Sequence, residues 1–163
     1  MGADHLIVAD ALELVGRRLR MLGFDVEPAG AVRLEQLFAR ARDRGRVALT
    51  SSARHPRRFA DVIAVTLPRS DPAAAVRAVA ERFVPTDAPF TRCPRCNVPL
   101  EPRAAVEARG AAPDDVVARG AALRHCPACG RWFWQGSHTD RIRAWLSAAL
   151  GREVPGPPEG PRP

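Results

Sequence analysis

Four cysteines are the residues of this chain whose type and spacing most clearly point to chemistry. They form two C-x-x-C pairs, Cys93 with Cys96 and Cys126 with Cys129, and the sequence contains no other cysteine. Each pair can aim two sulfurs at one ion, and two such pairs are typical of a closed, tetrahedral four-thiolate site. No coordination position stays open for water, so we expect the metal to stabilise the fold and not to catalyse.

Zinc is the metal that this pattern favours, as a structural Zn²⁺ ion bound by all four thiolates. A rubredoxin-like iron centre is the alternative, because four thiolates also bind iron, and it would make the protein an electron carrier. Disulfides are disfavoured because a cytoplasmic chain keeps its thiols reduced, and a redox dithiol would need no second copy of the motif.

The stretch around the second pair, HCPACGRWFWQGSH, adds three aromatic residues and two histidines. On a strand, Trp132, Phe133 and Trp134 point to alternate faces, so one ring can stay exposed and stack on a nucleic-acid base. His138 could contact a phosphate. The alternative is that the rings pack the small ribbon and that His138 bonds locally. Trp134 and His138 are therefore candidate nucleic-acid contacts.

Hydrolysis of a phosphodiester would need carboxylates, because Mg²⁺ or Mn²⁺ prefers hard oxygen ligands. Asp10 follows the first apolar run, and Glu35 lies in the first turn of the second predicted helix. Both are candidate catalytic metal ligands, although an acid near a helix N-terminus, such as Glu35, is also favourable without a ligand. The third apolar run ends in Thr50-Ser51-Ser52 and offers no carboxylate, so the predicted acidic site holds two acids.

These residues must be positioned by elements that alternate along residues 4–84. Short apolar runs predict strands at 5–10, 24–28, 46–50 and 61–67. Apolar residues at helical spacing predict helices at 11–23, 33–45 and 70–83. Asp71 and Pro72 are typical of a helix cap and of the first helical position. This alternation predicts an α/β domain with a small parallel sheet flanked by helices.

A proline-broken linker, 85–90, leads to a second unit, 91–150, which holds every cysteine. We expect this unit to be the metal ribbon followed by one helix, 140–150. The segment 101–122 between the two cysteine pairs is polar and alanine-rich, and we expect it to be a loop-like insertion. Residues 151–163 are so rich in proline and glycine that a disordered tail is predicted.

All 25 basic residues are arginine, and 18 acids leave a formal net charge of +7. Arginine forks match phosphate geometry, so this charge favours a nucleic-acid surface, to which we assign Arg17 and Arg20. A merely solvated basic surface explains the charge equally well. No apolar run is long enough to cross a bilayer and no leader is visible, so we expect a cytoplasmic protein without a membrane partner.

Several segments resemble one known family. They are "RRLRMLGFDV", "GRVALT", "FTRCPRCNVPL" and "CPACGRWFWQGSHTDRI", and their most specific parts are "RCPRCN", "CPACGR" and "WQGSH". Over residues 5–146 the chain resembles the PIN-like ribonuclease family named for the C-terminal domain of the exonuclease mut-seven. The resemblance implies a PIN-like α/β domain followed by a zinc ribbon, RNA as the partner, and metal-dependent RNase activity at acids on the strand ends.

Two positions depart from the family pattern. Ala9 stands where the family has the aspartate of an Asp-x-Met-Leu-Gly segment, and Asp10 follows one residue later. Ser52 stands where the family's Thr-Arg-Asp carries its carboxylate, and a neutral serine binds a divalent cation far more weakly. The resemblance thus implies either an RNase acting through Asp10 and Glu35 or a catalytically degenerate RNA-binding protein that keeps the zinc ribbon. Whether the chain has a protein partner is left open.

Overall fold

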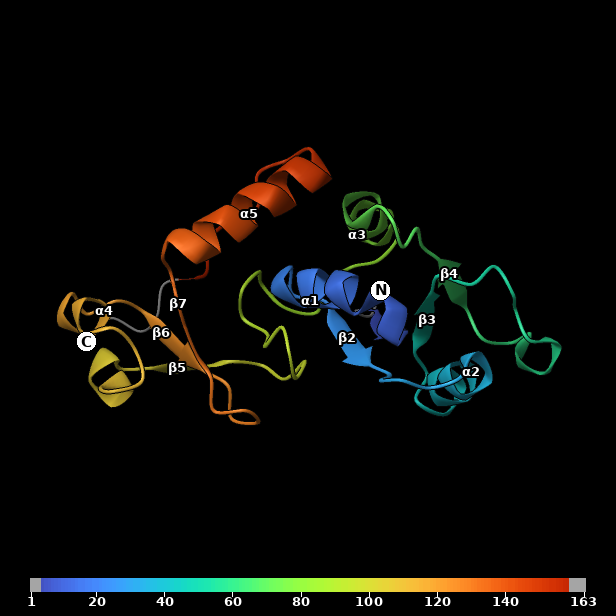
Figure 1. Ribbon diagram of the computed structural model, residues 1–163, viewed down its shortest axis with the longest axis horizontal. Coiled ribbons are helices and arrows are strands. Elements are labelled where there is room, and N and C mark those ends of the chain that lie inside the picture. Colours follow the sequence, from blue (N-terminus) through green and yellow to red (C-terminus); the bar gives the residue numbers. More distant parts are fainter. Residues whose placement is uncertain (1–3, 159–163) are drawn as a thin grey trace.

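The four predicted strands of the first domain form one parallel sheet in the computed structural model, which describes residues 4–158 (Figure 1). The strands are β1 (His5–Val8), β2 (Asp25–Pro28), β3 (Val47–Thr50) and β4 (Ala64–Thr66). Their order is β2-β1-β3-β4, and each neighbouring pair is parallel. Side chains alternate between the two faces of the sheet, so Leu6 and Val8 enter one core and Ile7 enters the other.

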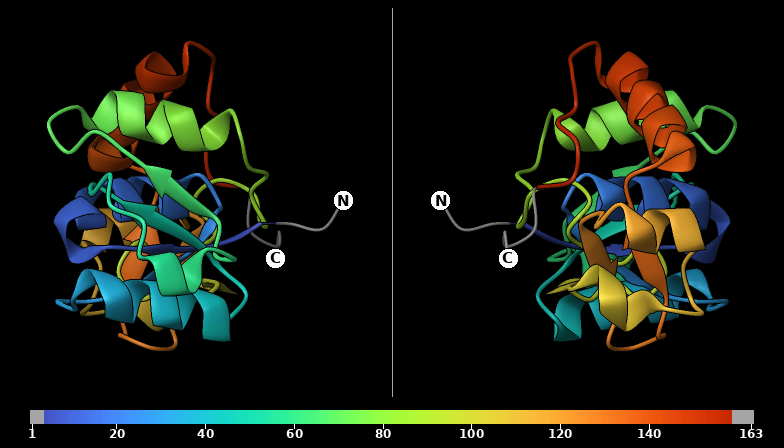
Figure 2. Two further views of the ribbon diagram at one scale, coloured as in Figure 1. Left: turned by 90° about the vertical axis from the view of Figure 1, so that its right-hand side faces the viewer. Right: turned by 90° about the vertical axis from the view of Figure 1, so that its left-hand side faces the viewer.

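Helices cover both faces of this sheet. They are α1 (Glu13–Met21), which follows a 3₁₀ turn (Asp10–Leu12), α2 (Leu34–Asp43), α3 (Pro72–Ala80) and α5 (Ser137–Leu150). Residues of α1, α3 and α5 share one core, whereas α2 and the 3₁₀ turn Arg57–Phe59 pack on the opposite face. Figure 2 shows α3 and α5 side by side on one side of the sheet and α2 on the other. Within residues 4–158, none of the helices has both the length and the apolar character that a bilayer crossing requires.

The cysteine-bearing part contains a small antiparallel sheet of β5 (Glu101–Arg103), β6 (Leu123–His125) and β7 (Trp132–Trp134). The segment 101–122 was expected to be a loop-like insertion, and this expectation is wrong. It contains β5, the 3₁₀ turn Ala105–Ala108 and the short helix α4 (Asp114–Ala118). These elements form a core of their own with Trp132 and Trp134, because Ala108, Val116 and Leu123 are buried among them.

The chain after the ribbon returns to the main core. Ile142 and Leu146 of α5 are buried with residues of α1 and α3, and Arg77 Nε donates to the Ala149 carbonyl at 2.7 Å. The predicted disorder from residue 151 onward does not hold for Val154, which is 1% exposed in the same core. The burial of this valine fixes that part of the proline-rich segment against the core. Residues 159–163 of the predicted tail lie outside the described residues.

The predicted fold class is confirmed. A parallel sheet is flanked by helices on both faces, and the four cysteines gather in the C-terminal part together with one long helix. The predicted cap of α3 is also present, because Asp71 Oδ1 accepts a hydrogen bond from the Ala74 backbone N–H at 3.0 Å and Pro72 occupies the first helical position.

Candidate metal centre and nucleic-acid interface

The two C-x-x-C turns have the same backbone geometry. In the first, the N–H of Asn97 donates to the carbonyl of Cys93 at 3.0 Å; in the second, the N–H of Gly130 donates to the carbonyl of Cys126 at 2.9 Å. Asn97 and Gly130 both adopt left-handed conformations, with φ of 64° and 70°. Glycine and asparagine reach this region at the lowest cost, so each pair is followed by a residue suited to the turn.

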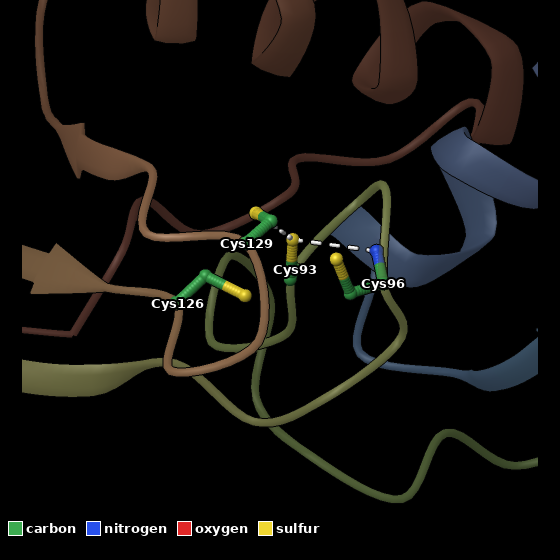
Figure 3. Close-up of side chains that lie close together, drawn as sticks. All are labelled: Cys93, Cys96, Cys126 and Cys129. Atoms are coloured by element: carbon green, nitrogen blue, oxygen red, sulfur yellow. Dashed lines mark hydrogen bonds between the residues drawn. The ribbon is translucent and has the colours of Figure 1, made fainter.

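The turns bring the four sulfurs together (Figure 3). Their ligand atoms lie within 4.8 Å of one another, and Cys93 Sγ is 3.9 Å from Cys129 Sγ. Four sulfurs at 2.3 Å from a central zinc would lie about 3.8 Å apart in a tetrahedron. The arrangement therefore fits a tetrahedral metal ion, and the four thiolates would hold it without an open coordination position.

Burial and mutual proximity shift the pKa values of these thiols in different directions. Burial raises the pKa of Cys93, and it raises the pKa of Cys96 to about 12 together with the nearby thiols. Burial alone would also raise the pKa of Cys129, but the backbone N–H of Arg131 and hydrogen bonds from the other cysteines lower it to about 7. A bound cation would stabilise the thiolate form, so a coordinated thiol loses its proton.

The first turn docks on the edge of the parallel sheet through Asn97. Its Oδ1 accepts from the backbone N–H of Val26 at 2.9 Å, and its Nδ2 donates to Asp25 Oδ1 at 2.6 Å. Val26 lies on β2, an outer strand, whose outward backbone groups have no strand partner. The ribbon thus supplies the hydrogen bond that a further strand would have made.

Arg20 completes the same junction from α1. Its Nε donates to the Val26 carbonyl at 2.7 Å, and its Nη1 donates to Glu13 Oε1 at 2.7 Å and to the Pro94 carbonyl at 2.8 Å. The residue is 0% exposed. The prediction that Arg20 contacts nucleic acid is therefore wrong, because its guanidinium is buried and bonded to protein acceptors on the sheet, the helix and the ribbon.

Asp25 joins this junction to the rest of the sheet. Burial alone would raise the pKa of its carboxyl, but hydrogen bonds with Arg46, Asn97 and His5 outweigh that effect and lower the pKa to about 2. Arg46 Nη1 lies 2.9 Å from Asp25 Oδ1, and His5 Nδ1 lies 2.8 Å from Oδ2. The charged carboxylate is the form that the junction stabilises.

A groove of about 920 Å³ lies where the ribbon meets α1 and the start of α5. Three of the four predicted nucleic-acid contacts line it, namely Arg17, Trp134 and His138. Arginines dominate the charge of its wall, because among residues 4–158 Asp140 is the one acid that lines it. The lining arginines are Arg17, Arg92, Arg95, Arg119, Arg124 and Arg131. The arrangement offers cations for phosphates and an indole for stacking.

The predicted acids lie elsewhere, at the carboxyl edge of the parallel sheet. Asp10 opens the 3₁₀ turn that follows β1 and is exposed. Glu35 lies in the first turn of α2, which follows β2, and neither acid lines the groove. Within residues 4–158, the four cysteines are the one group of three or more His, Cys, Asp or Glu side chains placed to share a metal ion.

Arginines surround Glu35 instead of further acids. Its carboxylate pairs with Arg58, and Arg54 Nη2 lies 3.8 Å from its Oε1. Ser52, which stands where the family pattern has a carboxylate, accepts a hydrogen bond at its Oγ from the Arg54 backbone N–H at 3.2 Å. These side chains therefore have protein partners at the edge where a catalytic cation would bind.

Sequence reasoning missed two features of this region. Asn97 carries the docking of the ribbon, and its position after the first cysteine pair, where the second pair has Gly130, was a usable signal. Arg119 and Arg124 line the groove. Arg119 lies within the segment 101–122 that was expected to be a loop, and Arg124 follows that segment. Neither arginine carries a local sequence pattern that marks it for the groove.

The fold and the site together define a class of protein: an α/β domain with a parallel sheet that carries a four-cysteine ribbon on one edge. A family model described as the Mut7-C RNAse domain matches residues 4–146, and the chain belongs to this family. The resemblance inferred from the motifs is thereby confirmed. Comparison with curated proteins gave no match, and comparison with solved structures gave none either.

Proposed function

We propose that this protein binds single-stranded RNA in the groove between the ribbon, α1 and α5. The observation that carries the proposal is the convergence of Arg17, Trp134 and His138 on one groove. Among residues 4–158, its wall holds one acid and five arginines besides Arg92, which is buried and paired with Asp87. Arginine guanidinium groups bind phosphates, and an indole accepts any base by stacking, so such a groove suits a strand with unpaired bases. Membership of an RNase-domain family supports RNA as the ligand.

Binding to a short fluorescent single-stranded RNA, followed by anisotropy, tests the proposal. Arg95→Ala removes an exposed lining arginine and should weaken binding and reduce the slope of log K against log salt by about 0.7. Arg69→Ala removes the same charge outside the groove and should leave both values unchanged. Equal effects of the two variants would mean that the charge of the whole surface, and not the groove, binds RNA.

Trp134 provides a second test that does not depend on charge. Trp134→Ala should weaken binding about fivefold or more, because stacking on one aromatic ring contributes about 1–3 kcal/mol per base. Trp134→Phe keeps a ring and the packing against the ribbon core, so it should retain most of the affinity. If Trp134→Ala binds RNA as the unchanged protein does, the ring has no part in binding.

We also propose that the four cysteines bind one structural Zn²⁺. The tetrahedral spacing of the sulfurs supports a closed four-thiolate site, for which zinc is the usual metal. Elemental analysis of the purified protein should give one zinc per chain and a colourless solution. A red protein containing iron would favour the electron-carrier alternative. A site of reduced thiolates also accords with the predicted cytoplasmic location.

A second candidate function is metal-dependent hydrolysis of the bound RNA. The place of Asp10, next to the carboxyl ends of β1 and β3, favours this function. The connections after these two strands leave toward opposite faces of the sheet, and open parallel sheets bind ligands at such points. Mg²⁺ or Mn²⁺ held by Asp10 and Glu35 would activate the attacking water.

Cleavage of labelled RNA in the presence of Mn²⁺ tests this second candidate. Asp10→Asn should abolish cleavage. Asp61→Asn should not, because Asp61 is an exposed acid that precedes β4, at the amino edge of the sheet. RNA binding without cleavage by the unchanged protein would leave the binding function standing alone. Cleavage that persists in Asp10→Asn would reject Asp10 as a metal ligand.

A further inference from the structure

The chain that leaves α5 turns back and enters the RNA groove. Gly151 ends the helix in a left-handed conformation, with φ of 63°. Val154 then anchors the segment, because its side chain is 1% exposed in the main core and its N–H donates to Ser147 Oγ at 3.0 Å. Pro157 and Pro158 follow, and both line the groove. The anchor thus fixes where the next residues lie.

The segment after Val154 forms a hydrogen bond with an arginine that RNA would need for binding a phosphate. Arg124 Nη2 donates to the Pro158 carbonyl at 3.2 Å, and Arg124 is one of the arginines that line the groove. The segment also runs close to α5, since a Cβ built on Gly156 would lie 3.3 Å from Arg143 Nη1. A phosphate that binds Arg124 would have to replace the Pro158 carbonyl, and a strand in the groove would have to displace the two prolines.

We infer that residues 155–158 form a cover segment that occupies one end of the groove and limits the entry of RNA. The inference rests on the proposed RNA-binding function and adds a regulation of the same site. A cover that leaves the groove open for a tenth of the time weakens the apparent affinity about tenfold. Among the described residues, one hydrogen bond, from Arg124 to Pro158, joins this segment to the groove wall, so RNA can displace it.

Deletion of residues 156–163 tests the cover segment and keeps the Val154 anchor, because the exposed Pro155 then carries the C-terminal carboxylate. The deletion removes one acid, Glu159, and one arginine, Arg162, so the net charge of the chain is unchanged. The shortened protein should bind a short single-stranded RNA about three- to tenfold more tightly than the full chain. Equal or weaker binding by the shortened protein would overturn the inference, because the segment would then be a neutral or contributing wall of the groove.

Chemical modification of Arg124 gives a readout that does not require RNA. Phenylglyoxal should modify Arg124 faster in the shortened protein than in the full chain, as followed by mass spectrometry of the peptides, with the exposed Arg69 as internal reference. Equal rates at Arg124 would also overturn the cover. If neither protein binds RNA, the proposed function fails, and the modification rates alone decide whether the segment covers the groove.

Val154→Ala keeps every residue of the cover but loosens its anchor. Its RNA affinity should lie between those of the full chain and the shortened protein, because the segment spends more time away from the groove. Circular dichroism checks that α5 and the sheet remain folded in this variant. A folded Val154→Ala protein that binds RNA more weakly than the full chain would contradict the cover.

Discussion

The Oδ1 atom of Asn97 accepts a hydrogen bond from the backbone N–H of Val26 at 2.9 Å, and this bond joins the metal ribbon to the edge strand of the parallel sheet. The carbonyl of Val26 is bonded by Arg20, so both outward groups of this residue have side-chain partners. Edge strands normally expose such groups. Here the ribbon and α1 cover the edge, and Pro94, which Arg20 bonds at this junction, also lines the groove.

Replacement of Asn97 should loosen this junction. Asn97→Gly tolerates the φ of 64° but leaves the Val26 N–H without its acceptor, so we expect a loss of about 1–3 kcal/mol and faster amide exchange at Val26. Asn97→Ala should cost about 1–2 kcal/mol more, because alanine is strained in the left-handed region. Unchanged exchange at Val26 in Asn97→Gly would show that the ribbon docks without this bond.

Loss of Arg20 should destabilise the protein strongly. Arg20→Met keeps the length of the side chain but leaves Glu13 and the carbonyls of Val26 and Pro94 without their donor, so we expect a loss of about 3–5 kcal/mol. Urea unfolding measures this change. Arg17→Met, on the same helix with a largely exposed side chain, should change the free energy of unfolding by less than about 0.5 kcal/mol. Similar effects of the two variants would contradict the buried role of Arg20.

Stability should fall in acid because of Asp25. The folded state lowers the pKa of its carboxyl from 3.8 to about 2, so the stabilisation is complete above about pH 5 and is lost as the pH falls toward 2. The shift corresponds to about 2 kcal/mol. Asp25→Asn should be less stable at neutral pH and should lack this part of the pH dependence. Metal release affects both proteins, so the difference between their unfolding curves isolates Asp25.

Removal of the metal should disrupt the ribbon and the groove together. Chelation should lower RNA affinity at least about tenfold, since folding of a four-thiolate ribbon draws its free energy from the metal. Addition of Zn²⁺ should restore binding, and Cys93→Ser should reproduce the loss even with zinc present. Native mass spectrometry counts the bound metal in each sample. Full RNA binding by the metal-free protein would mean that binding does not require the folded ribbon.

Local patterns in the sequence predicted most of the elements and the metal ligands. The spacing of Cys93, Cys96, Cys126 and Cys129 predicted one site, and their sulfurs converge within 4.8 Å. Alternating apolar runs predicted the strands and helices of the parallel domain, and Asp71 predicted the cap of α3. Each of these signals is contained within a few neighbouring residues, because turn geometry, helical periodicity and capping are local.

Only the tertiary structure decided the roles of residues that act through distant partners. Arg20 and Arg17 lie on the same helix and look alike in the sequence, yet Arg20 is buried and donates to the Pro94 carbonyl, which lies 74 residues away along the chain. Val154 is held in the core although its neighbours are prolines and glycines. Burial depends on which elements meet in space, so the sequence determined the four-cysteine cluster and the elements, and the packing decided which arginines face the groove.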